Sequence, residues 1–252
     1  MEWFQSGHVA IVTGGSRGLG KALAWELLGK GLTVIIDGRD PLRLERTRRA
    51  ILNDVSRTLS KDEGRLGNLT AIPGDVADPA HVHALVAAAK QAGRLDLLVN
   101  NASTLGQTPL PRIDQLDRET FRAVFDVNVF APIHLIQHAL PLMARSDPGT
   151  IVNITSDAGV EAYPAWGGYG ASKSALEHIS RVLAAEVKGN SSTRVLVFDP
   201  GDMNTAMHRD AMPDADPSEL RDPADSARAL MRAIAEMKGG FERVRASDLV
   251  TA

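Results

Sequence analysis

The chain of 252 residues contains no cysteine, and this absence excludes several kinds of chemistry. Disulfide bonds, thiolate nucleophiles and the common cysteine-based zinc frameworks all need a residue that the sequence lacks. An excess of one charge is also absent, because 28 lysines and arginines nearly balance 31 aspartates and glutamates. The net charge of -3 gives no electrostatic reason to expect nucleic acid or an anionic membrane as a partner. We therefore expect neither partner and no metal site.

A long hydrophobic run is missing as well. No apolar stretch approaches the roughly 18 residues that a membrane span needs, and residues 1–8 are too short and too polar for a signal peptide. The sequence does contain 44 % hydrophobic residues, which is enough for a sizeable core in one domain. We expect a cytoplasmic protein without a membrane partner, folded as a single domain over residues 1–252.

Short β-branched runs alternate with longer stretches at helical spacing, which is typical of a parallel sheet with helices on both faces. Strands are predicted at Val9–Thr13, Leu32–Ile36, Leu69–Ile72, Leu95–Asn100, Thr150–Thr155 and Arg194–Phe198, with a candidate seventh at Phe241–Arg245. Helices are predicted over residues 18–29, 41–58, 79–92, 118–145, 167–188 and 223–238. The predicted fold is α/β, a doubly wound parallel sheet of six or seven strands. Residues 56–68 should form a surface connection and residues 202–222 an irregular stretch.

A tyrosine and a lysine lie one helical turn apart in the run Tyr169-Gly170-Ala171-Ser172-Lys173, downstream of Ser156. On a helix, positions i and i+4 share a face, so the phenol and the ammonium group would point into one cleft. A phenol is a poor acid or base near neutrality because its ordinary pKa is about 10, and a neighbouring cation lowers that pKa by favouring the phenolate. The pattern thus predicts that Lys173 activates Tyr169, although an exposed pair on a helix surface is the ordinary alternative.

A glycine-rich segment, Thr13-Gly14-Gly15-Ser16-Arg17-Gly18-Leu19-Gly20, joins the first predicted strand to the first predicted helix. Glycines permit a tight turn and a close backbone approach to a pyrophosphate, and a helix N-terminus offers unpaired N–H groups to an anion. The spacing departs from the G-x-G-x-x-G dinucleotide motif. By itself, the segment therefore leaves an ordinary turn open as an alternative.

Together, the glycine segment and the Tyr169-x-x-x-Lys173 pair resemble the short-chain dehydrogenase/reductase family, whose fold is of the Rossmann type. Further matches follow in the family's order along nearly the whole chain: Asp75-Val76, Asn100-Asn101-Ala102, Asn128, Pro200-Gly201 and Thr205. Position 103 departs from the pattern, being Ser instead of Gly. Taken singly, Asp75 could cap a turn and Asn128 could be a buried structural amide, but all matches would have to be coincidental at once.

The resemblance implies an oxidoreductase that transfers a hydride between a nicotinamide cofactor and a carbonyl or alcohol substrate. Ser156 would bind the substrate oxygen, Tyr169 would be the general acid or base, and Asn128 would hold a water. The implied catalytic residues are Asn128, Ser156, Tyr169 and Lys173. The implied cofactor-binding residues are Gly14, Ser16, Arg17, Gly18, Leu19, Gly20, Arg39, Asp75, Val76, Asn101, Ala102, Tyr169, Lys173, Pro200, Gly201 and Thr205.

Two arginines favour NADP(H) over NAD(H) as the cofactor. Arg17 lies in the glycine segment and Arg39 follows the second predicted strand. Guanidinium groups bind phosphate through paired, charge-assisted hydrogen bonds, which suits a 2'-phosphate. Asp37 argues the other way, because an acidic residue about 20 residues beyond the glycine segment accepts from the ribose in many NAD enzymes. In the family pattern, however, the NAD-selecting acid falls at position 38, which is Gly here.

The expected substrate is a small aldehyde, ketone, quinone or alcohol, bordered by residues that follow Ser156 and Pro200. The candidate substrate residues are Asp157, Tyr163, Trp166, Met203 and Met207. The same side chains could instead pack a lid against the domain. An NADP-binding regulatory protein and a β-ketoacyl thioester reductase stay open as alternatives. A nucleotide-sugar epimerase or dehydratase is disfavoured, because those relatives usually carry a larger C-terminal substrate region.

The resemblance also bears on assembly. The family's dimer interface corresponds to the long apolar helices predicted over 118–145 and 167–188, so a homodimer is expected. Many members end in a Gly-Gly tail that supports tetramer packing. Here Gly239-Gly240 precede the last predicted strand instead, which leaves a tetramer open.

Overall fold

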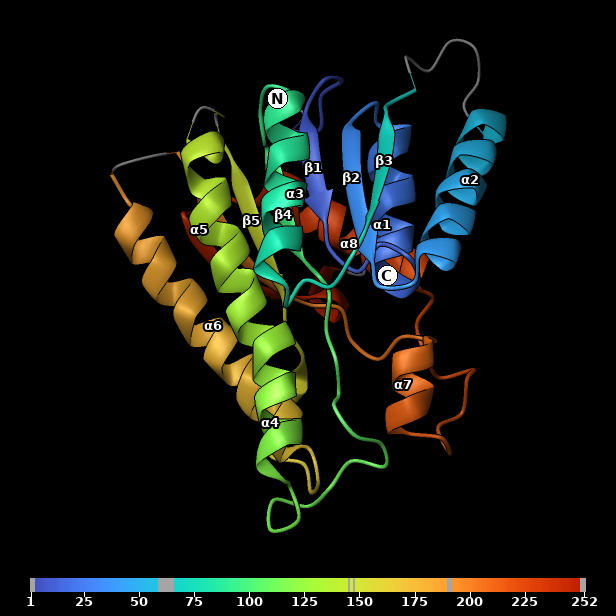
Figure 1. Cartoon of the computed structure of the whole chain (residues 1–252), viewed down its shortest axis with the longest axis vertical. Coiled ribbons are helices and arrows are strands. Elements are labelled where there is room, and N and C mark those ends of the chain that lie inside the picture. The colour runs from blue at the N-terminus through green and yellow to red at the C-terminus, as the bar shows by residue number, and fades with distance from the viewer. Residues whose placement is uncertain (1–2, 59–65, 145, 147, 190–191, 250–252) are drawn as a thin grey trace.

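Seven parallel strands form one sheet in the order β3-β2-β1-β4-β5-β6-β7 (Figure 1). The computed structural model describes residues 3–58, 66–144, 146, 148–189 and 192–249. The strands are β1 (Val9–Val12), β2 (Thr33–Gly38), β3 (Leu69–Pro73), β4 (Leu97–Asn100), β5 (Thr150–Ile154), β6 (Arg194–Asp199) and β7 (Phe241–Arg245). All six expected strands and the candidate seventh are therefore confirmed. The strand order reverses between β1 and β4, which is where open α/β sheets bind their ligands.

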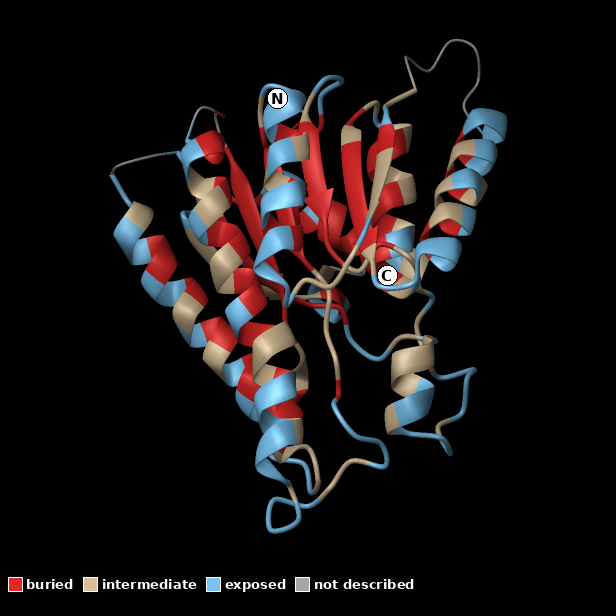
Figure 2. Cartoon of the chain, in the orientation of Figure 1, coloured by how far each residue is buried: buried red, intermediate tan, exposed pale blue. Residues whose placement is uncertain are grey.

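The strands alternate their side chains between two hydrophobic layers. In β1, Ala10 and Val12 belong to one buried cluster, whereas Val9 and Ile11 belong to the other. Because both faces are covered, β1 is buried throughout, which explains why its sequence is continuously apolar instead of alternating. Figure 2 shows the central strands buried between helices whose outer sides are exposed.

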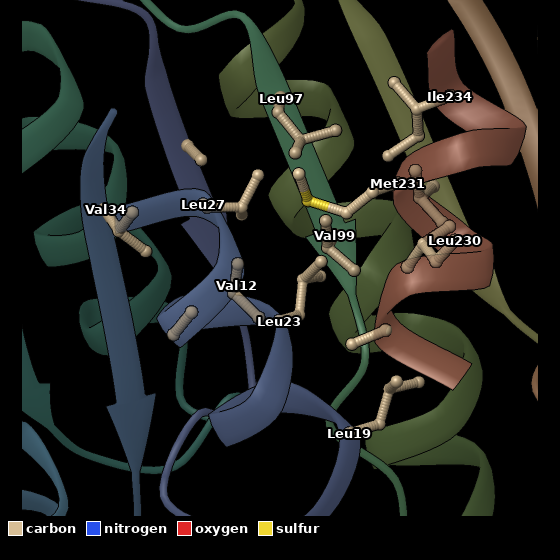
Figure 3. Packing of buried hydrophobic residues seen from close by; sticks show 14 of the residues in the cluster. Val12, Leu19, Leu23, Leu27, Val34, Leu97, Val99, Leu230, Met231 and Ile234 are labelled. Atoms are coloured by element: carbon tan, nitrogen blue, oxygen red, sulfur yellow. The ribbon is translucent and has the colours of Figure 1, made fainter. Parts of the chain in front are cut away.

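Three helices supply the first layer: α1 (Gly18–Gly29), α2 (Pro41–Thr58) and α8 (Pro223–Glu236). Figure 3 shows Leu23 of α1 and Leu230 of α8 pointing toward Val99 of the sheet. The opposite layer contains α3 (Pro79–Gln91), α5 (Ala131–Met143) and α6 (Gly167–Val187). The predicted helices thus form, and α3 and α8 begin with proline after a capping aspartate, Asp78 and Asp222 respectively.

The helix predicted over residues 118–145 is interrupted. It consists of α4 (Arg118–Phe125), a π-helical turn η1 (Asp126–Phe130) and α5, and residue 145 lies outside the described residues. Pro132 has no N–H to donate to the carbonyl of Asn128 four residues earlier, so a regular α-helical ladder cannot continue there. The π-helical turn therefore coincides with one of the expected catalytic residues.

Length and mean hydropathy alone would allow Arg118–Met143 to cross a membrane, contrary to the expectation that no stretch is long and apolar enough. This run packs in the fold as a core helix, because α5 contributes seven buried residues facing α3, α6 and the sheet.

Two irregular regions differ in outcome. Residues 202–222 were expected to lack regular structure, but they contain the short helix α7 (Ala206–Ala211), whose first turn is capped by the Thr205 hydroxyl. Short 3-10 turns also form at η2 (Asp157–Gly159) and η3 (Ala246–Leu249). Of the expected surface connection 56–68, residues 59–65 lie outside the described residues.

Candidate active site

The glycine segment forms a tight cradle between β1 and α1. Gly14 and Gly18 have φ angles of 67° and 53°, a region that favours glycine. A Cβ on Gly20 would lie 2.5 Å from the Gly14 carbonyl oxygen, so even alanine would collide with backbone. The segment is therefore shaped by glycine at several positions, as expected for a close approach of backbone to a ligand.

Hydrogen bonds from the end of β4 hold this cradle in place. The Asn101 side-chain amide donates to the Thr13 carbonyl at 2.7 Å. In return, the Thr13 hydroxyl accepts from the backbone N–H groups of Asn101 and Ala102, each at 3.0 Å. Asn101 and Ala102, which were expected to bind the cofactor, thus also fix the shape of the glycine segment.

Asp37 has a structural role at the end of β2. Its Oδ1 accepts from the Gly14 N–H at 2.6 Å, and its Oδ2 lies 2.9 Å from Nε2 of His81. The side chain is 1 % exposed. Both carboxylate oxygens thus have partners inside the protein, and Asp37 also lines the cavity described next.

A cavity of about 750 Å³ opens beside the glycine segment at the carboxyl ends of the strands. Most of the expected cofactor residues line it: Gly14, Ser16, Arg17, Gly18, Leu19, Arg39, Asp75, Val76, Asn101, Ala102 and Thr205. The expected residues outside its lining are Gly20, Tyr169, Lys173, Pro200 and Gly201, of which Gly201 lines a second cavity of about 460 Å³. Most of the expected cofactor residues thus border one cavity, and Tyr169 and Lys173 are not in its lining.

Charged residues of both signs line the larger cavity, and the carboxylates are Glu26, Asp37, Asp75 and Asp222. Arg17 and Arg39 are exposed and line it, as the sequence led us to expect. Sequence reasoning missed three further cations in the lining, namely Lys21, Arg209 and Arg228. Arg228 is already paired with Glu26 and Asp225, and Arg209 donates to Asn204, so Arg17, Lys21 and Arg39 are better placed to meet a ligand.

Asp75 has a local partner as well as a place in the cavity wall. Its Oδ1 accepts from the Ala77 N–H at 2.9 Å, which forms a turn just before α3. The helix cap itself is Asp78. The expectation that Asp75 contributes to a turn is thus confirmed, and its position in the lining keeps the cofactor prediction open.

Tyr169 lies buried at the start of α6, where three elements meet. Burial raises the pKa of Tyr169, and hydrogen bonds with the Ser103 and Ser156 hydroxyls act in the opposite direction. Ser156 follows β5, and Ser103 lies in the loop after β4. The structure therefore brings the predicted tyrosine and serine together and adds Ser103, which the sequence had marked only as a departure from the family pattern.

Lys173 lies one turn after Tyr169 and is also buried. Its Nζ donates to the Ile154 carbonyl at 2.9 Å and lies 5.4 Å from the centre of the Tyr169 ring. Burial lowers the pKa of Lys173 to about 8, while the charge of Asp199 raises it. The sequence predicted a Tyr169 pKa below its ordinary value. This prediction is wrong, because desolvation of the phenolate is the largest effect and raises the pKa.

Asn128 is buried in the π-helical turn with a fully bonded amide. Its nitrogen donates to the Thr104 carbonyl and the Ser172 hydroxyl, and its oxygen accepts from Ser103 and from the Thr104 N–H. The alternative of a buried structural amide is thus confirmed for the side chain. Pro132, four residues later, cannot donate an N–H to the Asn128 backbone carbonyl.

The comparisons with known proteins agree with this geometry. The family model for short chain dehydrogenases matches residues 8–216. The chain belongs to this family. It is 33 % identical over 224 residues to the oxidoreductase YciK of Escherichia coli K12, covering 86 % of this chain and 82 % of that protein. It is 36 % identical over 228 residues to the rhamnolipid-biosynthesis 3-oxoacyl-[acyl-carrier-protein] reductase of Pseudomonas aeruginosa, covering 88 % and 81 %.

Solved structures give the same result. A short chain dehydrogenase from Shigella flexneri, complexed with NADP, superposes with a TM-score of 0.83 at 28 % identity, covering 98 % of this chain and 100 % of that one. The fold of this dehydrogenase is therefore that of its family over nearly the whole chain.

A second group of polar residues, largely missed from the sequence, adjoins the predicted catalytic residue Ser156. Burial raises the pKa of Asp199 at the end of β6, and the Gly201 N–H donates to its Oδ1 at 3.0 Å. Asp157 accepts from the Ser156 hydroxyl and from the Tyr163 phenol, each at 2.9 Å. Asp157, Asp199 and Gly201 line the second cavity. Asp157 thus positions Ser156, an orienting contact that was not predicted.

The aromatic and methionine candidates surround the phenol loosely. Trp166 packs edge-on against Tyr169 with ring centres 5.7 Å apart, and Tyr163 lies next along at 6.4 Å from Trp166. Met207 of α7 packs against the same small cluster, and Met203 and Met207 both line the larger cavity. Trp166 and Met207 are therefore gathered around Tyr169, whereas Met203 packs against the cluster formed by α1 and α8. These side chains serve as packing, as the alternative explanation holds.

Proposed function

We propose that this dehydrogenase is an NADPH-dependent reductase of aldehyde, ketone or quinone carbonyls, working through Tyr169 as the general acid. The observation that carries the proposal is the buried phenol, whose pKa the Ser103 and Ser156 hydroxyls act to lower, beside a cavity with two unpaired arginine side chains in the described residues. Among the described residues, the side chains of Arg17 and Arg39 have no hydrogen-bond or ion-pair partner.

The residues present fit a dinucleotide. Even one Cβ at Gly20 would close the cradle, the cavity of about 750 Å³ suits a ligand of that size, and the α1 N-terminus faces it. The glycine segment would hold the pyrophosphate, and Thr205 would hold the nicotinamide. Arg17 and Arg39 would bind a 2'-phosphate. When bound, the nicotinamide supplies or accepts the hydride. The Shigella flexneri relative complexed with NADP supports the choice of cofactor.

The side chains of Tyr169, Ser156 and Lys173 suit the reduction of a carbonyl substrate. Because burial keeps the pKa of Tyr169 above its ordinary value, the phenol is protonated near neutral pH and can give its proton to the substrate oxygen. Ser156, oriented by Asp157, would donate a hydrogen bond to the same oxygen and stabilise the charge that develops there. Lys173, with a pKa of about 8, remains mostly charged at pH 7 and would bind the ribose hydroxyls. The Asn128 backbone carbonyl would hold a water near Lys173.

The remaining expectations complete the proposal. One domain spans residues 1–252, residues 202–222 with α7 cover the substrate, and the protein works in the cytoplasm.

A homodimer through α4, α5 and α6 is supported by three exposed apolar side chains on those elements and the intervening turn, Phe121, Phe130 and Val182. Light scattering at micromolar concentration should return a dimer mass, and a monomer mass would argue against the interface.

A β-ketoacyl thioester reductase is a second candidate, favoured by the 36 % identity to the Pseudomonas aeruginosa 3-oxoacyl reductase. An NADP-binding regulator is less well supported, because it needs no buried phenol with two serine partners.

Initial rates with a panel of aldehydes, ketones, quinones and β-ketoacyl thioesters, each with NADPH and with NADH, test the proposal. Turnover of simple carbonyls that prefers NADPH is expected. Preference for thioesters would favour the second candidate. Tight NADPH binding with no turnover on any substrate would favour the regulator.

A further inference from the structure

Three histidines meet on the outer side of the α3–α5 layer. His83 comes from α3, and His134 and His138 come from α5. Figure 1 shows these two helices side by side on one face of the sheet. Nε2 of His134 lies 2.9 Å from Nε2 of His138, and the His83 ring centre lies 4.4 Å from that of His138 and 5.7 Å from that of His134. Three of the chain's seven histidines are thus in mutual contact.

The helix geometry explains how they converge. His134 and His138 are four residues apart, so they share one face of α5. That face is turned toward α3, because neighbouring Leu135 and Ala139 join Val82 and Leu85 in the same buried cluster. The packing of the two helices, and not the histidines themselves, holds the three rings at this separation.

The spacing of the three ring nitrogens suits a cation. One ring nitrogen from each histidine can be chosen so that all three lie within 4.8 Å of one another. Zinc–imidazole bonds of about 2.0–2.1 Å in tetrahedral geometry place ligand nitrogens roughly 3.4 Å apart. Side-chain rotations that move the ring nitrogens by about 1 Å would therefore bring all three within bonding distance of one ion.

We propose that His83, His134 and His138 bind one divalent transition-metal ion of the zinc, nickel or cobalt type and thereby join α3 to α5. Imidazole nitrogens suit these ions, and three histidines leave a coordination position for water. None of the three lines either described cavity, so the site is separate from the dehydrogenase cleft. The proposal departs from the sequence expectation of no metal site, because excluding cysteine frameworks does not exclude an all-histidine ligand set.

The test uses full-length protein without a polyhistidine tag, stripped of metal with EDTA and dialysed. Calorimetry with Zn²⁺ and with Ni²⁺ should give one ion per chain, and Co²⁺ should develop visible absorption bands of a nitrogen-ligated ion. Mg²⁺, which prefers oxygen ligands, should not bind. Saturating Zn²⁺ should raise Tm by about 5 °C, because a ligand that binds only the folded state stabilises it.

The variants separate the site from adventitious binding. His138→Ala should lower Zn²⁺ affinity about 100-fold and abolish the Co²⁺ bands. His83→Ala tests the contact across helices and should lower the affinity at least tenfold, since His83 is exposed and its loss leaves the fold intact. His178→Ala, an exposed histidine on α6 outside the cluster, is the matched control and should bind like the wild type. Equal Zn²⁺ affinity in the wild type and His83→Ala would overturn the proposal, as would loss of binding in His178→Ala. NADPH turnover should be unchanged in His83→Ala.

Discussion

The two sides of the dehydrogenase cleft hold their polar groups in different ways. On the β1–β4 side, short hydrogen bonds hold the glycine segment. The Gly14 N–H donates to the Asp37 carboxylate, and the Asn101 side-chain amide donates to the Thr13 carbonyl. On the β5–β6 side, ionisable groups are buried at a cost. Burial raises the pKa of Tyr169 and of Asp199 and lowers that of Lys173 to about 8, so each is pushed toward its neutral form.

This difference indicates a division of labour. The first side fixes a shape, and a substitution there should change how well the cofactor fits. The second side keeps reactive groups in a low-dielectric environment, where they weaken the fold but can exchange protons. A substitution there should abolish chemistry while sparing, or even improving, stability. The predictions below test that division, beginning with the largest effect.

Tyr169→Phe should lower kcat by about 1,000-fold, because it removes the general acid while keeping the ring that packs against Trp166. NADPH affinity and Tm should stay near the wild-type values. Steady-state rates, fluorescence titration with NADPH and thermal unfolding measure the three quantities. The chain's other tyrosine offers a comparison, since Tyr163→Phe loses only a hydrogen bond to Asp157 and should lower kcat less than tenfold. Comparable losses in both variants would contradict the assignment of Tyr169.

Gly20→Ala should weaken NADPH binding by about 30-fold, because the new Cβ would lie 2.5 Å from the Gly14 carbonyl and push the cradle apart. Overpacking of this kind typically costs about 1–3 kcal/mol. Gly29→Ala is the matched control at the other end of α1, where a Cβ meets no atom within 4 Å. It should bind NADPH normally and unfold at or slightly above the wild-type temperature. If Gly20→Ala bound NADPH like Gly29→Ala, the cradle would not be the cofactor site.

Local patterns made much of this structure predictable. The β-branched runs identify all seven strands, and the tyrosine and lysine share a helix face because their spacing is one turn. Glycine's conformational freedom likewise marks the cradle. These features depend on residues close together in the sequence, where spacing determines geometry.

Features that depend on contacts between distant segments could not be predicted. Ser103 reaches Tyr169 only because the loop after β4 meets the start of α6. Asp37, at the end of β2, lies beside His81 of α3, which gives Asp37 a structural contact that its position in the sequence does not reveal. The sign of the tyrosine pKa shift needs the depth of burial, which spacing to Lys173 does not reveal. His134 and His138 do carry a local signal, their four-residue spacing, but the contribution of His83 follows from helix packing alone.

The buried lysine should make folding stability depend on pH. Its folded-state pKa of about 8 lies below the unfolded value of 10.5, so between these limits the unfolded chain holds more protons and stability rises with pH. From pH 7 to pH 9.5, urea unfolding of the apo protein should therefore show a gain of about 2 kcal/mol, at about 1.36 kcal/mol per pKa unit. Tyr169 acts oppositely only above about pH 10, where unfolded tyrosine ionises.

Lys173→Met should remove this gain and be more stable than the wild type at pH 7. Lys90→Met, on the exposed side of α3, is the control and should keep the wild-type pH dependence. The difference in unfolding free energy between the wild type and Lys173→Met should change as the pH rises from 8 to 9.5, in favour of the wild type. No change, or a change in favour of the variant, would show that burial does not destabilise the ammonium.

Arg39→Ala should give the smallest effect and sharpen the comparison on the cofactor side. Arg39 is exposed at the cavity wall, so its loss should leave the fold and kcat unchanged while raising the NADPH KM about tenfold, through loss of charge-assisted bonds to a 2'-phosphate worth about 1.4 kcal/mol. The NADH KM should change less than twofold, because that cofactor has no such phosphate. Arg46→Ala, an exposed arginine on α2 outside the cavity lining, controls for net charge and should alter neither KM. Equal rises in both KM values for Arg39→Ala would mean that the arginine supports the shape of the cradle, and that this side of the cleft selects its cofactor by another group.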